Sequence, residues 1–283
     1  MTTVLSIQSA VAYGHVGNSA ATFPLMRRGV EVIDVLTVNF SNHTGYGAWR
    51  GPLIPAADVA EVIAGVADRG VLGSVDAVLS GYLGAADVGE VILDAVASVR
   101  ELNPKAIYLC DPVMGDVGRG FYARPGIPEF MRDEVLQHAD VITPNQFELE
   151  FLAGTETKTL DDVLSAADML RAKGPSVVLV TSVAGVGGPN TLTMVGVSDT
   201  GAWQVQTPYL DRTFTGSGDL TSAMFLAQLL ETDDLARAIE NTANIVYSVL
   251  AETTRIESAE LALVKAGDLI VEPAASFTAT QIR

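Results

Sequence analysis

The chain alternates short apolar runs with longer amphipathic segments over most of its length. β-Branched runs predict strands at residues 3–8, 31–38, 76–81, 106–112, 141–145 and 176–182, and helical periodicity predicts helices near 18–28, 56–68, 86–102, 127–137 and 160–173. Continuous apolar strands separated by helices are typical of a parallel sheet that is covered on both faces. The pattern therefore predicts a mostly parallel, doubly wound α/β sheet flanked by helices.

The pattern changes after Ser182. Residues 191–208 alternate apolar and polar side chains around the turn sequence SDTG, which predicts an antiparallel hairpin at one edge of the sheet. Helices near 219–230 and 234–252 follow. Because there is no internal repeat, low-complexity tract or linker, we expect residues 1–283 to form one domain.

Composition and charge narrow the class of protein. With 48% hydrophobic and 18% charged residues, the chain can bury a large core. A formal net charge of −17 repels nucleic acid and anionic membrane surfaces. The single cysteine, Cys110, excludes an intramolecular disulfide and a zinc site built from several thiolates. There is no basic leader and no apolar stretch of about 18 residues. We therefore expect a cytoplasmic protein with no nucleic-acid or membrane partner.

Residues 214–230, FTGSGDLTSAMFLAQLL, carry the clearest chemical signal. Gly216 and Gly218 are poor helix formers, whereas the apolar residues from Leu220 onward recur at helical spacing. The glycines therefore mark a helix entrance, where free backbone N–H groups and the helix dipole bind anions. Beside such a site, Asp219 is either a capping acid or a base next to a transferring phosphoryl group.

Polar or glycine-rich segments follow four of the predicted strands, at residues 9–20, 39–51, 111–126 and 143–150. Ligands of open α/β sheets bind beyond the carboxyl ends of the strands, so these segments are expected to surround one site. The dinucleotide fingerprint GxGxxG and the Gly-Lys dipeptide of Walker-type phosphate loops are both absent. A bound phosphate would therefore depend on backbone amides and a metal ion.

Together these segments resemble the pyridoxal kinases of the ribokinase-like superfamily. GSGD at residues 216–219 is shared by many sugar and vitamin kinases, whereas SNHTGYG at 41–47 and SGYLG at 80–84 point to the pyridoxal branch. The resemblance covers nearly the whole chain, and it implies ATP-dependent phosphorylation of the 5′-hydroxyl of pyridoxal in vitamin B6 salvage. The chain differs from one bacterial branch of pyridoxal kinases at two positions. Lysine is common in that branch at the position of Thr181, and glutamine is common at the position of Gly45.

The resemblance also implies roles for the matched residues. Asp219 corresponds to the catalytic base, and Gly216, Ser217 and Gly218 correspond to the anion hole. The positions implied to bind the substrate, together with Asp219, are Ser9, Val38, Phe40, His43, Thr44, Gly45 and Tyr82. His43 is a lone loop histidine and is given no catalytic role.

A second set of positions is implied to bind ATP and cations. They are Asp111, Asp116, Tyr122, Thr143, Asn145, Glu148, Thr181, Thr207, Pro208, Tyr209, Leu210 and Gly218. Asp111, Asp116 and Glu148 offer the hard oxygen ligands that suit Mg²⁺. Thr143, Asn145 and Thr181 match positions that line the nucleotide and a monovalent cation such as K⁺.

Structural explanations remain open for several of these residues. Asp111 can end a strand, Glu148 can lie in the first turn of a helix, and Pro208 and Leu210 can simply pack. Buried hydroxyls that bond the backbone explain Thr143 and Thr181 almost as well. Residues 111–126, with four glycines and Arg119, Tyr122 and Arg124, predict either a lid over ATP or a long surface connection.

Three rival functions also remain open. The first is a hydroxymethylpyrimidine or sugar kinase of the same fold. The second is a non-catalytic vitamin-binding protein, which the retained Asp219 argues against. The third is a nicotinamide-dependent oxidoreductase, which the missing glycine fingerprint disfavours. The resemblance further implies a homodimer.

Overall fold

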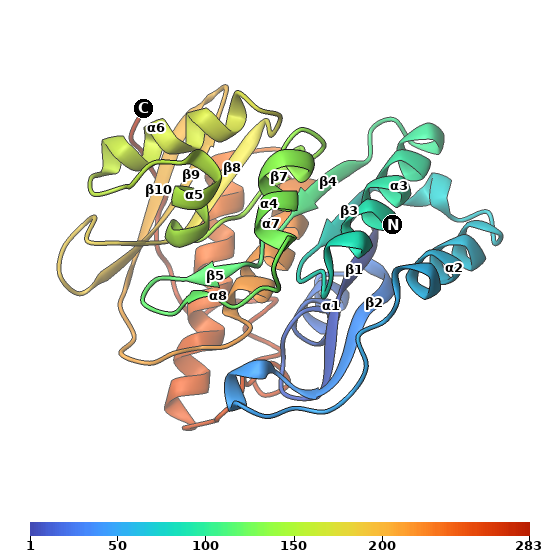
Figure 1. The fold of residues 1–283 in the computed structure, drawn as a ribbon. Coiled ribbons are helices and arrows are strands. Elements are labelled where there is room, and N and C mark those ends of the chain that lie inside the picture. Colours follow the sequence, from blue (N-terminus) through green and yellow to red (C-terminus); the bar gives the residue numbers. More distant parts are fainter.

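A nine-stranded sheet runs through the centre of the protein, whose computed structural model describes residues 1–283 (Figure 1). The strand order is β11-β10-β9-β8-β7-β4-β3-β1-β2. The six parallel strands are β1 (Thr3–Tyr13), β2 (Glu31–Asn42), β3 (Ala77–Ser80), β4 (Ile107–Cys110), β7 (Val141–Ile142) and β8 (Val177–Ala184). The antiparallel strands β9 (Thr191–Ser198), β10 (Gly201–Pro208) and β11 (Thr280–Gln281) extend the β8 edge.

Helices cover both faces of this sheet. One face packs against α1 (Asn18–Arg27), α7 (Ser217–Thr232) and α8 (Leu235–Arg255). The other packs against α2 (Ala56–Ala67), α3 (Ala86–Leu102), α4 (Ile127–Phe130), α5 (Gln146–Ala153) and α6 (Leu160–Arg171). The fold is therefore the mostly parallel, doubly wound α/β sheet with an antiparallel edge that the hydrophobic pattern predicts.

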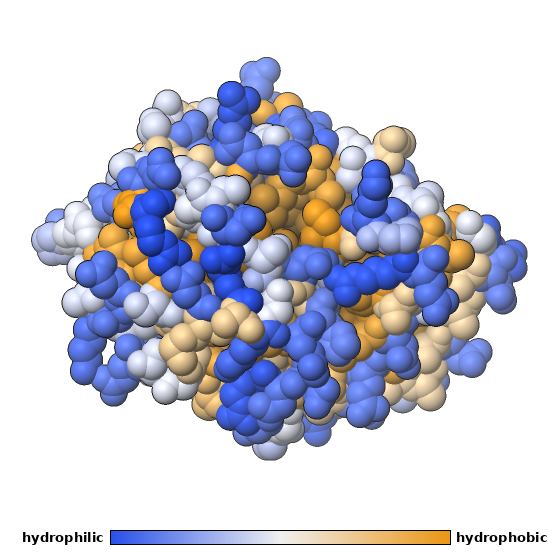
Figure 2. Space-filling view, turned by 90° about the horizontal axis from the view of Figure 1, so that it is seen from above, coloured by the Kyte–Doolittle hydropathy of each residue, from blue (hydrophilic) through white to orange (hydrophobic).

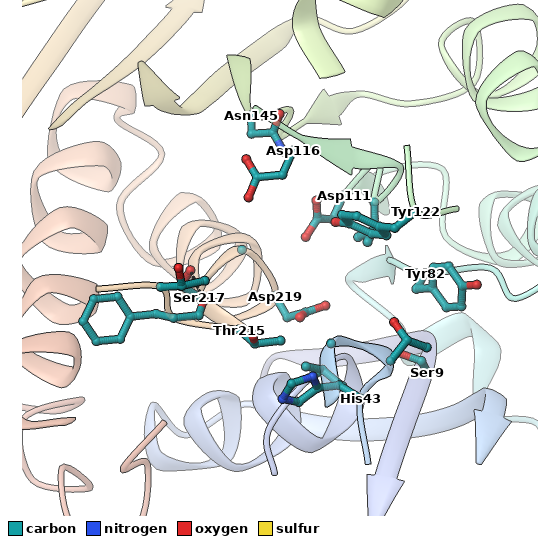
Figure 3. Close-up of a pocket in the computed structure, with 18 of the residues that line it drawn as sticks. Ser9, His43, Tyr82, Asp111, Asp116, Tyr122, Asn145, Thr215, Ser217 and Asp219 are labelled. Atoms are coloured by element: carbon teal, nitrogen blue, oxygen red, sulfur yellow. Dashed lines mark hydrogen bonds between the residues drawn. The ribbon is translucent and has the colours of Figure 1, made fainter. Parts of the chain in front are cut away.

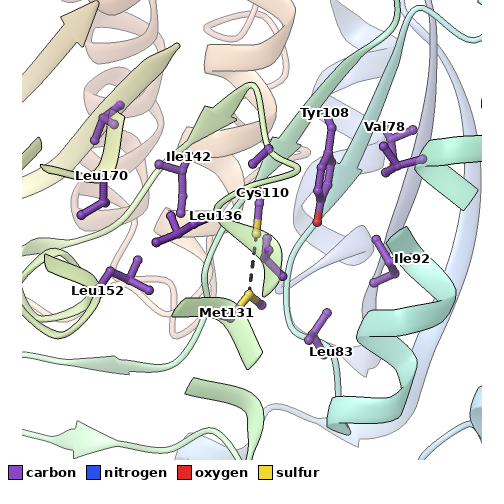
Figure 4. Close-up of a cluster of buried hydrophobic side chains, with 14 of the residues drawn as sticks. Val78, Leu83, Ile92, Tyr108, Cys110, Met131, Leu136, Ile142, Leu152 and Leu170 are labelled. Atoms are coloured by element: carbon purple, nitrogen blue, oxygen red, sulfur yellow. Dashed lines mark hydrogen bonds between the residues drawn. The ribbon is translucent and has the colours of Figure 1, made fainter. Parts of the chain in front are cut away.

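Alternation along the strands builds the two cores. On β3, Leu79 joins the cluster under α1, α7 and α8, whereas its neighbour Val78 joins the cluster under α2–α6. Figure 4 shows this second cluster, where the Cys110 Sγ lies 3.8 Å from the Met131 Sδ. Burial raises the pKa of the Cys110 thiol to about 12, so this cysteine is an inert core residue.

The sequence pattern misplaced several local elements. The helix expected at 127–137 is α-helical only over Ile127–Phe130, and a π-helical turn follows over Met131–Val135. Helix α5 and strand β11 were not predicted, and residues 111–126 contain a small hairpin, β5 (Gly115–Asp116) with β6 (Gly120–Phe121), instead of an unstructured loop. Short elements offer too few apolar positions for periodicity to detect.

The face seen in Figure 2 is mostly hydrophilic, and its hydrophobic residues lie in separate areas between hydrophilic ones. None of the helices combines the length and the apolar character that crossing a membrane would require.

Candidate active site

A cavity of about 240 Å³ lies beyond the carboxyl ends of the parallel strands. It gathers side chains from segments that are far apart in the sequence (Figure 3). The predicted site residues that line it are Ser9, Val38, Phe40, His43, Thr44, Gly45, Tyr82, Asp111, Asp116, Tyr122, Thr143, Asn145, Glu148, Thr181, Gly216, Ser217, Gly218 and Asp219. Thr207, Pro208, Tyr209 and Leu210 do not line the cavity, so their contact with adenosine stays a prediction.

The entrance of α7 forms one end of the cavity. Gly216 precedes the helix with φ +89°, a left-handed conformation that favours glycine. A Cβ at Gly216 would also collide with the carbonyl oxygen of His15. At Gly218 the nearest atom to an added Cβ is the Asp111 Oδ2 at 4.0 Å, so this position is open. No side chain caps the helix. The Ser217 N–H donates to the Phe214 carbonyl at 3.3 Å, whereas the N–H groups of Gly216 and Gly218 have no backbone partner and can face an anion.

Asp219 lies in the first turn of α7, and its side chain points into the cavity (Figure 3). Burial raises the pKa of the Asp219 carboxyl to about 6, although the backbone amides of Gly17 and of Asp219 itself oppose the rise. A carboxylate with a pKa near the working pH is suited to accept a proton.

Asp111 follows β4 and contributes another buried carboxylate to the cavity. Its side chain is buried, and its Oδ2 has no hydrogen-bond partner. Burial raises its pKa well above the ordinary value, and the negative charges of Asp219 and Glu148 raise it further. A buried oxygen without a partner fits a bound cation, which would compensate the cost of burying the charge.

Glu148 has a different environment, because backbone amides occupy its oxygens. Its Oε1 accepts from the N–H of Met114 at 2.8 Å, and its Oε2 accepts from the N–H of Asn145 at 3.0 Å. The Asn145 side chain accepts from the Glu148 N–H in return, so the pair forms a capping box at the start of α5. Burial raises the pKa of Glu148 to about 8. Glu148 therefore occupies the first turn of a helix and also holds the segment after β4.

The structure does not bring the three predicted metal ligands together as a protein-only metal site. No group of three or more His, Cys, Asp or Glu side chains is placed to hold a metal ion. Asp116 lies on the β5–β6 hairpin, where its Oδ1 accepts from the N–H of Val117 at 2.8 Å. A magnesium ion here would therefore need oxygen ligands from the nucleotide or from water as well.

The buried carboxyl groups make the stability of the unliganded protein depend on pH. Because the pKa values of Asp219 and Glu148 are raised to about 6 and about 8, the folded protein binds more protons than the unfolded chain between roughly pH 4 and pH 8. The free energy of unfolding should therefore fall as the pH rises from 5.5 to 8.5. The fall is about 1.4 kcal/mol per pH unit for each proton that the folded protein binds in excess of the unfolded chain.

Thermal melts across this pH range test the expectation. Glu148→Gln should flatten the decline, whereas the matched change Glu61→Gln on the exposed face of α2 should not. A wild-type melting temperature that rises with pH, or an unchanged slope in Glu148→Gln, would contradict it.

Apolar side chains form another wall of the cavity. Val38 and Phe40 of β2 are buried and pack with Val11, Val16 and Tyr82. Ser9 lies where the pairing register of β1 and β2 shifts, an irregularity that is often found beside active sites. Figure 3 shows Ser9 and Tyr82 on the same side of the cavity.

Two predicted nucleotide residues also have structural hydrogen bonds. The Thr143 hydroxyl lies 2.7 Å from the Ser222 hydroxyl, and the Thr181 N–H donates to the Pro144 carbonyl at 3.0 Å. Both threonines line the cavity. Their contacts with ATP or a monovalent cation stay predictions.

The β5–β6 hairpin lies beside the cavity and is attached to α5. The Asn145 Nδ2 donates to the Gly115 carbonyl at 2.8 Å, and Phe121 packs edge-on against Phe147 at 4.9 Å between ring centroids. Arg119 lies over the ring of Tyr122 at 4.9 Å, and both residues line the cavity. This arrangement favours the lid interpretation over a plain connection.

Some lining residues were not found from the sequence. They are Val11, Val16, Val113, Ser182, Thr213, Phe214 and Thr215. All except Val16 lie within three residues of a predicted position, and Thr213–Thr215 directly precede GSGD. Their types are too common in cores and turns to indicate a site, so only their proximity to the motifs could have identified them.

The chain is similar to known proteins over most of its length. Residues 29–263 match the family described as phosphomethylpyrimidine kinase. The pyridoxal kinase PdxY of Leifsonia xyli subsp. xyli is 53% identical over 280 residues, which cover 99% of each chain. Two structures of the Leishmania donovani pyridoxal kinase, with ADP and ginkgotoxin and with ADP and pyridoxamine, have TM-scores of 0.94 and 0.93, with 32% and 31% identity and full coverage of both chains.

The fold and these similarities first define the class of the protein, a kinase of the ribokinase-like fold. Within that class, the chain belongs to the pyridoxal kinase family. The expected family, fold and enzyme class are therefore confirmed.

Proposed function

We propose that this protein transfers the γ-phosphate of ATP to the 5′-hydroxyl of pyridoxal, with pyridoxine and pyridoxamine as related acceptors. The observation that carries the proposal is the position of Asp219. Its carboxylate points into the cavity from the first turn of α7, and the buried side chains of Val38 and Phe40 form an apolar wall of the same cavity. An acceptor hydroxyl held against that wall would meet the base and the phosphate in one place.

The chemistry assigns a task to each end of the cavity. The oxygen of the 5′-hydroxyl attacks the γ-phosphorus while Asp219 accepts the hydroxyl proton. The bond between the γ-phosphorus and the oxygen that bridges it to the β-phosphate breaks, which releases ADP. The amides of Gly216, Ser217 and Gly218 would hold the oxygens of the transferring group. Separating the apolar acceptor pocket from the amide-rich phosphate end orients the two reactants.

The proposal includes Mg²⁺ with the nucleotide. The unpaired Asp111 Oδ2 supports a cation close to the phosphates, and Asp116 and Glu148 would act through water. The cation would neutralise charge on the ATP phosphates as the bond breaks. Thr143, Asn145 and Thr181 would line the nucleotide, and a monovalent cation such as K⁺ would lie beside them.

We further propose that residues 111–126 close over ATP. Arg119 and Tyr122 line the cavity from this segment, and the chain offers few other cations near it. Hydrogen exchange of the amides from about 115 to 124 should slow when ATP and Mg²⁺ are added.

Steady-state kinetics test the same lid. Tyr122→Ala should raise the KM for ATP several-fold, with a smaller effect on pyridoxal. Val117→Ala, at an exposed position of the same hairpin that does not line the cavity, is the control and should change neither constant. Unchanged exchange at saturating nucleotide would show that the segment is only a connector.

A substrate panel tests the proposed acceptor. With ATP and Mg²⁺, turnover should be fastest with a B6 vitamer, lower with hydroxymethylpyrimidine, and lowest with ribose. The buried walls of Val38 and Phe40 cannot bond the extra hydroxyls of a sugar, and each unpaired buried polar group costs about 1–3 kcal/mol. Preferred turnover of hydroxymethylpyrimidine or ribose would identify another kinase of this fold. Binding of vitamers without any turnover would identify a non-catalytic protein.

The proposal also includes a homodimer in the cytoplasm, as the family resemblance implies. Closed two-fold pairing is the most frequent assembly of soluble proteins, which supports it. Sedimentation equilibrium should give twice the 29.7 kDa chain mass. A monomer mass at all concentrations would contradict it.

A further inference from the structure

Glu260 follows α8, outside every motif that the sequence singled out, and accepts hydrogen bonds from three donors. Its Oε2 accepts from the backbone N–H of His15 at 3.3 Å. Its Oε1 accepts from the Nε2 of His43 at 3.2 Å and from the Tyr46 hydroxyl at 2.5 Å. The Glu260 side chain is only 10% exposed. One largely buried carboxylate therefore joins two loops that are more than 200 residues away in the sequence.

Both loops belong to the walls of the cavity. His43 lines it directly, together with Thr44 and Gly45 of the 3-10 turn Thr44–Tyr46. The ring of Tyr46 stacks on that of His43 with 4.5 Å between centroids, so the hydroxyl bond to Glu260 also fixes the imidazole plane.

The loop between β1 and α1 connects the same carboxylate to the reacting groups. His15 donates its N–H to Glu260, and its carbonyl lies against Gly216 at the entrance of α7. Two residues later, the backbone amide of Gly17 bonds the Asp219 carboxyl and opposes part of the rise in its pKa. A side chain at Gly14 would collide with the Glu260 carboxylate, so the loop passes close to it.

The chemistry of the donors fixes the state of each partner. A carboxylate only accepts hydrogen bonds, so the Nε2 of His43 carries a proton. The bond to Glu260 raises the pKa of Tyr46 to about 12, so the phenol stays a donor. A Cβ at Gly45 would lie 2.9 Å from the His43 Nδ1, so this ring position also requires the glycine two residues later.

Glu260 is itself fixed to the core. The next two residues, Leu261 and Ala262, are buried, and the Ala262 N–H donates to the Thr253 hydroxyl of α8 at 3.0 Å. The Ser258 hydroxyl donates to the Glu260 carbonyl at 2.7 Å. The carboxylate is therefore a rigid attachment point, unlike a mobile surface acid.

We propose that Glu260 is a positioning residue for the acceptor substrate. It holds the 43–46 turn and the Gly14–Gly17 loop in the places where they form the acceptor end of the cavity next to Asp219. The inference rests on the proposed function, because it assigns Glu260 to the pyridoxal end. It names no contact between Glu260 and the substrate, since the carboxylate acts through His43, Tyr46 and His15.

The test is a comparison of KM values in Glu260→Ala. Removing the charge-assisted hydrogen bonds should raise the KM for pyridoxal at least about tenfold and leave the KM for ATP within about twofold. Glu150→Gln is the matched control. Glu150 also binds a loop, accepting from the Thr157 N–H at 2.8 Å and from its hydroxyl at 2.9 Å, but it does not line the cavity. Both KM values of the control should stay unchanged.

A double-mutant cycle extends the test to milder variants, in case Glu260→Ala folds poorly. Tyr46→Phe removes one donor from an exposed side chain, and Glu260→Gln keeps the size of the acceptor. Both should raise the KM for pyridoxal, and the double variant should lose less than the product of the single effects, because the two changes break the same bond.

Two outcomes would overturn the positioning role. One is a KM for pyridoxal within twofold of wild type in Glu260→Gln and Tyr46→Phe, and the other is an equal rise in the KM for ATP, which would indicate general loosening. These outcomes are distinct from failure of the proposed function. That failure would appear as a wild-type protein that does not phosphorylate pyridoxal at all.

Discussion

Asp219→Asn should lower kcat for pyridoxal phosphorylation by about 10²–10⁴, because the amide keeps the shape of the side chain but cannot accept the proton of the acceptor hydroxyl. The affinity for nucleotide should change little, since the amides at the entrance of α7 remain. Steady-state kinetics and an ATP-analogue titration give the two quantities.

Asp233→Asn supplies a matched control at the other end of the same helix. Asp233 is exposed, follows the last residue of α7 and does not line the cavity. Its substitution should leave kcat unchanged. Near-normal turnover in Asp219→Asn would remove the base from the mechanism, and the acid would then be a helix-capping residue.

Gly216→Ala adds a single methyl group and should strongly reduce both stability and activity. Gly216 has φ +89°, and a Cβ there would meet the His15 carbonyl oxygen, so the entrance of α7 must move. We expect the melting temperature to fall and the activity to drop by more than about 100-fold, the size of loss typical when one donor to a transferring group is misplaced.

Gly218→Ala separates strain from function in the same motif. Its Cβ has open space in the unliganded protein, and its backbone φ is not positive. The melting temperature should stay at the wild-type value while activity falls, because the added methyl group faces the proposed phosphate position. Equal losses of stability in both variants, or full activity in Gly216→Ala, would contradict the anion-hole assignment.

The long, strongly patterned elements could be predicted from the sequence. The alternation of β-branched runs and amphipathic segments identified the parallel strands, the major helices and the antiparallel edge formed by β9 and β10. It missed α5, which has eight residues and whose start is specified by the Asn145–Glu148 capping box more than by apolar periodicity. The spacing Asn-x-x-Glu before an apolar run was the available signal.

The sequence predicted those lining residues of the cavity that lie in recognisable motifs. Residues that follow strands were brought together because parallel strands end at the same edge of the sheet. Residues 207–210, at the end of β10, do not line the cavity, and their contact with adenosine stays a prediction. Glu260 could not have been assigned, because only the three-dimensional fold places the segment after α8 beside His15, His43 and Tyr46.

Identifying the phosphorylated oxygen of the product shows whether the protein is a pyridoxal 5′-kinase that depends on Asp219. The purified protein would be incubated with ATP, Mg²⁺ and pyridoxal, and the product examined by mass spectrometry and by ³¹P and ¹H NMR. We expect one phosphate on the 5′-oxygen, one ADP per phosphorylated vitamer, and loss of both products in Asp219→Asn. Phosphate on another oxygen, ADP release without phosphorylated vitamer, or equal product from Asp219→Asn would contradict it.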